Sequence, residues 1–115
     1  MEFKLLLAMT EDSRVDAVLQ AAREAGATGA TVITSARGEG LMPKKTFLGL
    51  DLTGQRDVIL LVVEAHLSRD ILAAVARAGE FETRPGCGIA FQLAIEDAAG
   101  LGSQIRALSG RRPQP

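Results

Sequence analysis

The sequence is poor in aromatic residues: it contains no Trp and no Tyr, and aromatic residues make up 3% of it. This scarcity argues against a surface that binds nucleic acid by stacking bases on aromatic rings. The formal net charge is −1, so no general electrostatic attraction to nucleic acid or to an anionic membrane is expected. Long apolar runs are missing too. The aliphatic run Val58–Val63 has six residues, far below the roughly 20 that cross a bilayer.

The chain has one cysteine and one histidine, which excludes most metal and catalytic sites. Cys87 has no partner for an internal disulfide or for a redox pair, so packing as a small residue is favoured over redox sensing. His66 alone cannot make a typical zinc site or a Ser-His-Asp or Cys-His-Asn set, and a cap or surface role is favoured for it. We therefore predict no enzyme activity and no metal. The N-terminal residues lack the features of a signal peptide, which indicates a cytoplasmic protein.

The 115 residues suit a single domain, predicted over residues 1–108, with residues 109–115 as a flexible tail. Apolar runs and β-branched residues predict four strands, and apolar residues at helical spacing predict helices between them. Thr10 and Ser68 are predicted to cap the first two helices, and Gly26 and Gly79 to end them. The predicted strands are 3–9, 30–34, 57–64 and 89–95, and a third, short helix is expected at 97–108.

The order of these elements is β-α-β-β-α-β, which predicts an α+β, ferredoxin-like sandwich. Right-handed crossovers place the first and third strands side by side in the centre, with both helices on one face of the sheet. The chain offers no cover for the other face. Because the residues on the central strand are aliphatic, another subunit is expected to bury that face, and a homo-oligomer follows.

The most unusual segment is Arg37–Gln55, between the second and third strands. A hairpin needs only two to five residues there, and longer connections are usually functional or disordered. This segment holds four glycines, a Lys44-Lys45 pair and several apolar residues. We interpret it as a loop that binds something, and an extended hairpin with a disordered tip is the alternative.

Four short motifs, in this order along the chain, resemble those of the PII signal-transduction superfamily. They are Thr28-Gly29-Ala30-Thr31-Val32, Arg37-Gly38-Glu39-Gly40, Pro85-Gly86-Cys87-Gly88-Ile89-Ala90-Phe91 and Ile95-Glu96-Asp97-Ala98. In that family a T-G-x-T-V run leads to a G-x-G at the base of the long T-loop, and a second G-x-G precedes the last strand.

The resemblance implies a homotrimer that binds an adenine nucleotide (ATP, ADP or AMP) or another small anionic effector between subunits. Glycine-rich turns suit such a ligand, because backbone N–H groups can converge on an anion without interference from a Cβ atom. The implied partner is a membrane transporter, contacted through loop 37–55. The predicted ligand-binding residues are Thr31, Arg37, Gly38, Gly40, Arg84, Gly86, Cys87 and Gly88, and those of the partner-binding loop are Leu41, Met42, Lys44, Lys45 and Phe47.

The chain also departs from the classical PII pattern. Ile89 replaces a phosphate-binding Lys, Gly100 and Gly102 replace two Arg residues, and Met42 replaces a Gln that helps to hold a metal–nucleotide–2-oxoglutarate complex. The segment also lacks the tyrosine that classical members can have uridylylated. Sensing of ATP-Mg and 2-oxoglutarate is therefore not carried over. The cations that could replace the lost charge are Arg37, Lys44, Lys45 and Arg84, with solvated loop charges as the alternative for each.

Two other kinds of function fit the same architecture. Trimeric divalent-cation-tolerance proteins share it, but one His and one Cys offer few soft ligands for a metal. A small enzyme that uses the cleft between subunits would need a base and a nucleophile, and the sequence provides no such pair.

Overall fold

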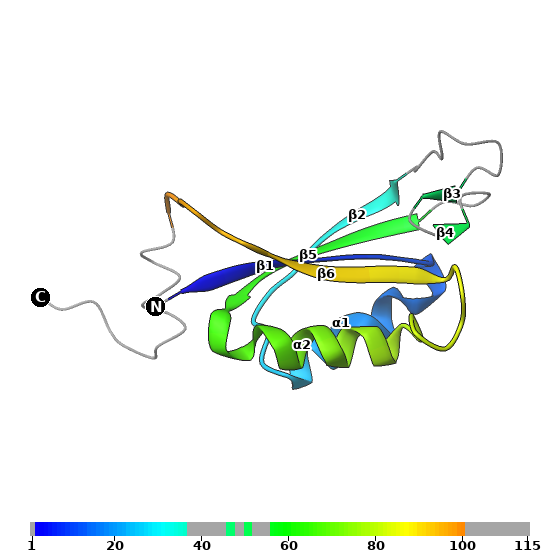
Figure 1. Ribbon diagram of the computed structural model, residues 1–115, viewed down its shortest axis with the longest axis horizontal. Helices are drawn as coiled ribbons and strands as arrows, with labels where there is room; N and C mark the ends of the chain where they lie inside the picture. The colour runs from blue at the N-terminus through cyan, green and yellow to red at the C-terminus, as the bar shows by residue number, and fades with distance from the viewer. Residues whose placement is uncertain (1, 37–45, 48–49, 52–55, 101–115) are drawn as a thin grey trace, which may run out of the picture.

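The computed structural model describes residues 2–36, 46–47, 50–51 and 56–100. Four antiparallel strands form a sheet in the order β2-β5-β1-β6, and both helices lie on the same face of it (Figure 1). The elements are β1 (Phe3–Thr10), a 3-10 turn (Asp12–Arg14), α1 (Val15–Glu24), β2 (Thr31–Ala36), the short pair β3 (Thr46–Phe47) and β4 (Leu50–Asp51), β5 (Arg56–Glu64), α2 (Ala65–Ala78) and β6 (Gly88–Ala94). This confirms the predicted α+β, ferredoxin-like order.

The two central strands are the first and third long strands, as predicted. β1 and β5 pair along their whole length, from Phe3 opposite Glu64 to Thr10 opposite Asp57. β2 and β6 form the two edges of the sheet. The aliphatic runs of β1 and β5 explain why these two strands take the centre, because strands there have no edge exposed to water.

The core lies between the sheet and the helices. Alternate residues of β1 and β5 point into it, as the twofold period of a strand requires. Ile59, Ile71 and Val18 are fully buried, and burial of each such side chain contributes roughly 1.5–3 kcal/mol. The buried cluster consists of Leu6, Ala8, Ile59, Leu61 and Val63 from the sheet and Val18, Ala22, Ile71 and Val75 from the helices.

Both predicted helix caps are wrong. Thr10 is the last residue of β1, paired with Asp57 and Gly88, and helical structure begins only at Asp12. Ser68 lies inside the first turn of α2, where its Oγ donates a hydrogen bond to the carbonyl oxygen of Ala65 at 2.9 Å. For Ser68, the reason is that β5 runs directly into α2, which leaves no loop residue to act as a side-chain cap.

The predicted helix ends are close to the observed ones. α1 ends at Glu24, and Gly26 follows in the left-handed region with φ of 117°. Gly79 follows the last residue of α2 but stays right-handed, and the left-handed conformation falls on Glu80, with φ of 59°. A non-glycine residue at positive φ is uncommon, and the contacts of Glu80 described below hold it there.

Several predictions fall wholly or partly outside the described residues. Residues 97–100 form no helix, and the remainder of the predicted helix 97–108 lies outside the described part, as does the tail 109–115. Of the predicted partner-binding loop, only Phe47 lies within it, on β3, whereas Leu41, Met42, Lys44 and Lys45 do not.

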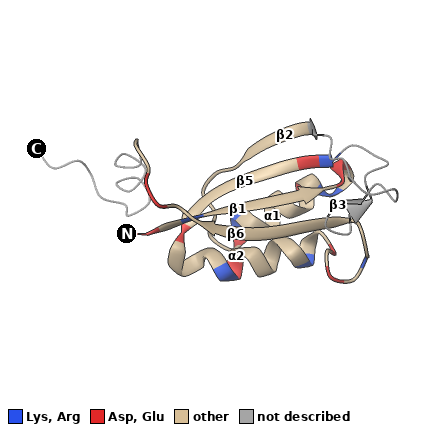
Figure 2. Cartoon of the chain, turned by 45° about the horizontal axis from the view of Figure 1, so that its top comes forward, with Lys and Arg blue, Asp and Glu red and all other residues tan. Residues whose placement is uncertain are grey.

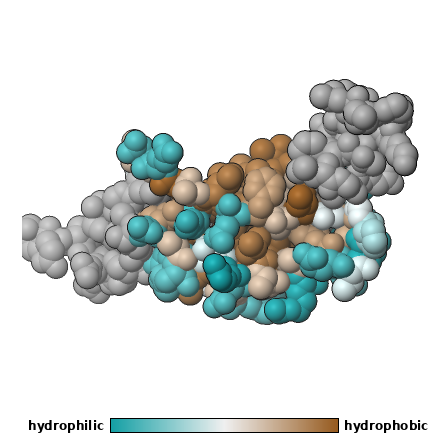
Figure 3. Space-filling model, in the orientation of Figure 1, coloured by the Kyte–Doolittle hydropathy of each residue, from teal (hydrophilic) through white to brown (hydrophobic). Residues whose placement is uncertain are grey.

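The face of the sheet away from the helices is apolar and open, as predicted. Ile33, Val62 and Leu93 on this face are 43–47% exposed. The charged residues of the sheet lie near the ends of its strands (Figure 2), and apolar side chains gather over the sheet (Figure 3). The register places ten apolar residues on this face: Leu5, Leu7, Met9, Ile33, Val58, Leu60, Val62, Ile89, Phe91 and Leu93.

Candidate functional site

One end of the sheet gathers the two segments that carry the predicted ligand-binding glycines. Ala36 ends β2 opposite Arg56, and Gly88 begins β6 opposite Thr10, which is itself paired with Asp57. The segment 37–55 therefore leaves and rejoins the sheet at the end where loop 79–87 arrives. Arg37, Gly38 and Gly40 lie outside the described residues, and this placement rests on the strand ends.

Within one chain, these two segments attach to opposite edges of the sheet. β2 and β6 are separated by β5 and β1, and three strand spacings amount to about 14 Å. Thr31, at the far end of β2, is separated from Ala36 by five residues, or about 16 Å along the strand. The fold therefore brings Arg84, Gly86, Cys87 and Gly88 together in one loop but does not bring Thr31 to them in the same chain.

The loop before β6 is held by the ring of Phe81. A Cβ atom on Gly79 or Gly88 would overlap this ring, and on Gly88 it would also lie 2.7 Å from the carbonyl oxygen of Met9. Gly88 is therefore required for packing, whatever it does for a ligand. Gly86 has φ of 79°, a conformation that glycine adopts without steric cost.

The thiol of Cys87 faces the end of α2 and is buried. Its Sγ lies 3.4 Å from the carbonyl oxygen of Gly79 and 3.2 Å from that of Glu80, so it can donate to either. These are carbonyls at a helix end that lack partners within the helix. The side chain therefore has the small-residue packing role favoured from the sequence, and the Cys87 N–H donates within the loop to the carbonyl oxygen of Arg84 at 3.2 Å.

The predicted ligand cation Arg84 is engaged in an ion network. Its Nη1 lies 3.4 Å from Oε2 of Glu80, and its Nη2 lies 3.9 Å from Oε1 of Glu11. Glu80 is also paired with Arg14. The network links the 3-10 turn to the loop before β6. The Arg84 side chain remains 50% exposed, so an anion in solvent can compete with the two carboxylates.

Three polar residues are buried at the same end of the sheet, and sequence reasoning singled out only Thr10 among them, as a helix cap. Thr10 is completely buried, and Arg56 and Asp57 are 9% and 8% exposed. The Thr10 hydroxyl makes no hydrogen bond within the described part of the chain. A signal was present, because Arg56 and Asp57 directly follow the unusual segment 37–55 and precede an otherwise aliphatic strand.

The remaining candidates from the sequence lie apart from this site. His66 is exposed on α2, with its Nε2 3.5 Å from Oε2 of Glu64. Glu96 and Asp97 are exposed beyond β6. Among the described residues, no three His, Cys, Asp or Glu side chains are grouped so that they could hold a metal ion. No helix in the described ranges is long and apolar enough to cross a membrane.

The sequence pattern of the family described as nitrogen regulatory protein P-II matches residues 3–104. The chain belongs to the P-II family. Members of this family are regulatory signalling proteins rather than typical enzymes. The match covers β1 through β6 and includes all four motifs that carry the resemblance in the sequence.

Solved structures share the P-II fold with this chain at low sequence identity. One is the apo form of CPII from Thiomonas intermedia K12, a nitrogen regulatory PII-like protein, with a TM-score of 0.63, 20% identity and coverage of 83% of this chain and 90% of the other. Another is a PII-like signalling protein from Thermus thermophilus, with a TM-score of 0.58, 22% identity and coverage of 83% and 91%. No curated protein matches significantly.

Proposed function

We propose that this P-II family member is a cytoplasmic homotrimer that binds a small anionic effector between subunits, an adenine nucleotide above all. In this proposal, the ligand lies between the start of segment 37–55 of one subunit and the loop Arg84–Gly88 of its neighbour. Arg37, Gly38 and Gly40 come from the first, with Thr31 from the β2 strand that leads to it, and Arg84, Gly86, Cys87 and Gly88 come from the second. The protein then controls a partner, proposed to be a membrane transporter, through loop 37–55.

The observation that carries this proposal is the position of the two glycine-containing segments. They meet the sheet at the same end but at opposite edges, about 14 Å apart by strand spacing. A binding site to which both segments contribute is therefore easier to form between neighbouring copies, where the β2 edge of one subunit adjoins the β6 edge of the next. The open apolar face supports the same assembly, since a contiguous apolar surface of this kind marks an interface.

Arg84 is the described cation best placed for an anion in this cleft. It is half exposed, it lies two residues before Gly86, and its ion pairs are long, at 3.4 and 3.9 Å. A phosphate offers charge-assisted, bidentate hydrogen bonds to the guanidinium group. Ligand binding would thus exchange two weak ion pairs for stronger ones and would loosen the tie between the 3-10 turn and the loop.

The proposed output lies in loop 37–55. Effector binding would favour one conformation of this loop over others, by the difference between the affinities of the effector for the two states. Leu41, Met42 and Phe47 would supply the apolar contact with the partner, and Lys44 and Lys45 a charged rim.

The test is isothermal titration of the purified protein with ATP, ADP and AMP, each with and without Mg²⁺. We expect saturable binding near one site per subunit, and about 10–100-fold weaker binding by Arg84→Gln, because a hydrogen bond to a charged group is worth roughly 1.5–3 kcal/mol. Arg77→Gln, an exposed arginine on α2, is the matched control and should bind as the wild type does. Absence of binding by the wild type, or equal affinity in Arg84→Gln, would contradict the proposed site.

A further inference from the structure

A cavity lies between α1 and the start of β2, on the helix side of the sheet. It has a volume of about 480 Å³ and is partly open to solvent, within the range of small-molecule sites. Its walls are Leu19, Ala22, Arg23, Ala27, Thr28, Gly29, Ala30, Val32 and Leu61. The space exists because small residues follow α1: alanines and a glycine at 27, 29 and 30 do not fill the gap beside the core.

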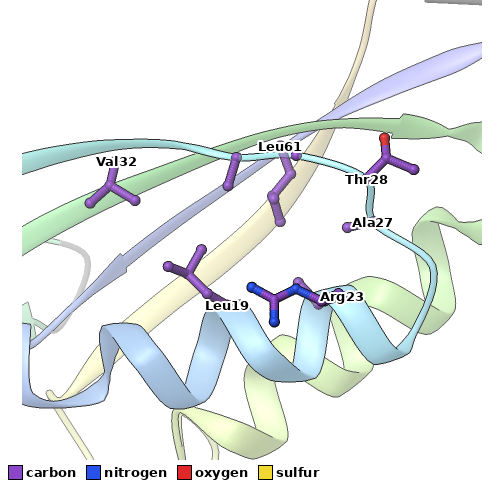
Figure 4. Close-up of a pocket in the computed structure, with 9 residues that line it drawn as sticks. Leu19, Arg23, Ala27, Thr28, Val32 and Leu61 are labelled. Carbon is purple, nitrogen blue, oxygen red and sulfur yellow. The ribbon is translucent and has the colours of Figure 1, made fainter. Parts of the chain in front are cut away.

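The cavity combines an apolar floor with a single cation. Leu61 and Ala22 are buried at its base, and Leu19 and Val32 pack partly against the core. Figure 4 shows the guanidinium group of Arg23 beside Leu19, facing the side chain of Leu61 that descends from the sheet. Mostly apolar walls with a few polar or charged groups are typical of small-molecule sites, and a single cation among them suits an apolar molecule with one anionic head.

The charge of Arg23 is available to such a head group. Nη1 of Arg23 donates a hydrogen bond to the amide oxygen Oε1 of Gln20 at 2.9 Å. Arg23 makes no ion pair with any described residue. The Gln20 amide is oriented by its own donation from Nε2 to Glu24. A guanidinium group has five N–H donors, so four remain to bind an anion. A carboxylate matches this group with two parallel hydrogen bonds.

We propose that this cavity binds a medium-chain carboxylate, with its alkyl chain on Leu19, Val32 and Leu61 and its head group on Arg23. A carboxylate is favoured over a phosphate ester because one guanidinium balances a single negative charge. The proposal does not rest on the nucleotide site. The cavity is on the helix side, away from the open face, and Thr28–Ala30 precede β2 at the end of that strand opposite Ala36.

The cavity also suggests how such a ligand would act on the rest of the molecule. Val32 contacts the core from β2, and β2 continues directly to Ala36, where segment 37–55 begins. An alkyl chain against Val32 would fix the start of β2 on α1. The expected effect is a stiffer β2 edge, visible as slower amide hydrogen exchange in residues 28–33.

The test is titration of the full-length protein with octanoate, followed by methyl NMR spectra and calorimetry. We expect saturable binding near one molecule per chain, with shifts at Leu19, Val32 and Leu61. Arg23→Gln should weaken binding about 10–100-fold through loss of the charge-assisted hydrogen bonds. Arg69→Gln, an exposed arginine on α2 without a described ion partner, should leave affinity unchanged. Octanol, with the same chain and no charge, should bind at least about 10-fold more weakly.

Three results would overturn the proposal. One is an absence of saturable octanoate binding, with no change at these methyl groups. Another is binding that Arg23→Gln does not weaken or that octanol matches, because the site would then be an apolar surface alone. The third is a shift of the Leu19 and Val32 signals with protein concentration but not with octanoate, which would assign the cavity to a second copy of the chain. Nucleotide titrations of Arg23→Gln separate this site from the Arg84 site, since they should match the wild type.

Discussion

At the scale of single residues, packing and ligand binding make overlapping demands on the loop before β6. Gly88 and Cys87 were singled out from the sequence as parts of a phosphate-binding turn. The structure gives each a packing role as well: Gly88 makes room for the ring of Phe81, and Cys87 donates toward carbonyls at the end of α2. A substitution at either position therefore changes stability before it reports on binding, which is why Arg84 is the better probe.

Gly88→Ala should lower the free energy of unfolding by about 1–3 kcal/mol, the usual cost of adding a methyl group to a filled space. The new Cβ would overlap the Phe81 ring and approach the Met9 carbonyl, and backbone cannot move aside as a flexible side chain can. Urea denaturation monitored by circular dichroism measures the change. Gly29→Ala is the control, because nothing lies within 4 Å of its Cβ position. Equal stability of the two variants would contradict the close packing of the Phe81 ring against Gly88.

At the scale of elements, the sequence predicted the strands and helix stripes well because each depends on local periodicity. The aliphatic run of β5 and the spacing of Val18 and Ala22 on α1 identify their elements without knowledge of the rest of the chain. The predicted caps failed for the opposite reason. Whether Thr10 begins a helix or ends a strand is decided by its pairing with Asp57 and Gly88, which are distant in the sequence.

The site was predictable in part for the same reason. The two glycine motifs are local, so the sequence reveals them, and the strand order then places Ala36, which precedes the first motif, and Gly88, in the second, at one end of the sheet. The ion network of Arg14, Glu80, Arg84 and Glu11 could not be predicted. It joins two loops by side chains alone, and no local pattern in the sequence pairs these four charges with one another.

Glu80→Gln tests what this network does to the loop. The substitution removes the charge that Arg84 and Arg14 share, at a stability cost of at most about 1 kcal/mol for pairs this exposed. If Arg84 binds the nucleotide, its release should raise affinity several-fold, about 2–5-fold for a pair worth 0.4–1 kcal/mol. Calorimetric titration with ATP or ADP measures this effect. Glu82→Gln, an exposed acid in the same loop, makes the same change in charge and should have no effect. A decrease in affinity in Glu80→Gln would mean that Glu80 orients Arg84 for the ligand.

At the scale of the whole molecule, the two faces of the sheet differ in how much apolar surface they expose to water. The helix-covered face is closed by the core, whereas the other carries ten apolar residues in register across four strands. A monomer would expose this face, and an oligomer would bury it while aligning the β2 and β6 edges of neighbours. The proposed ligand site and the proposed trimer are thus two consequences of one surface.

Val62→Glu should dissociate the oligomer while leaving the fold intact. Val62 is 43% exposed on the open face and points away from the core, so the carboxylate stays in water in the monomer but would be buried without a partner in an interface. Sedimentation velocity measures the mass, and circular dichroism the fold. Ala73→Glu, on the exposed side of α2, is the matched control and should assemble as the wild type does. A Val62→Glu protein of unchanged mass would place the interface elsewhere.

β5 ends at Glu64 and α2 begins at the next residue, so that residues 56–78 form a strand followed directly by a helix that runs back along the sheet. The strand of nine residues runs about 30 Å away from the ligand-loop end of the sheet. The helix of 14 residues returns about 21 Å. The strand is therefore about 9 Å longer than the helix that returns along it, and loop 79–87 follows, with Gly79 and Gly88 both packed against the ring of Phe81. The length of α2 therefore bears on the loop that holds Arg84: one further turn would extend the helix by about 5 Å, beyond the point where Gly79 now packs against the Phe81 ring.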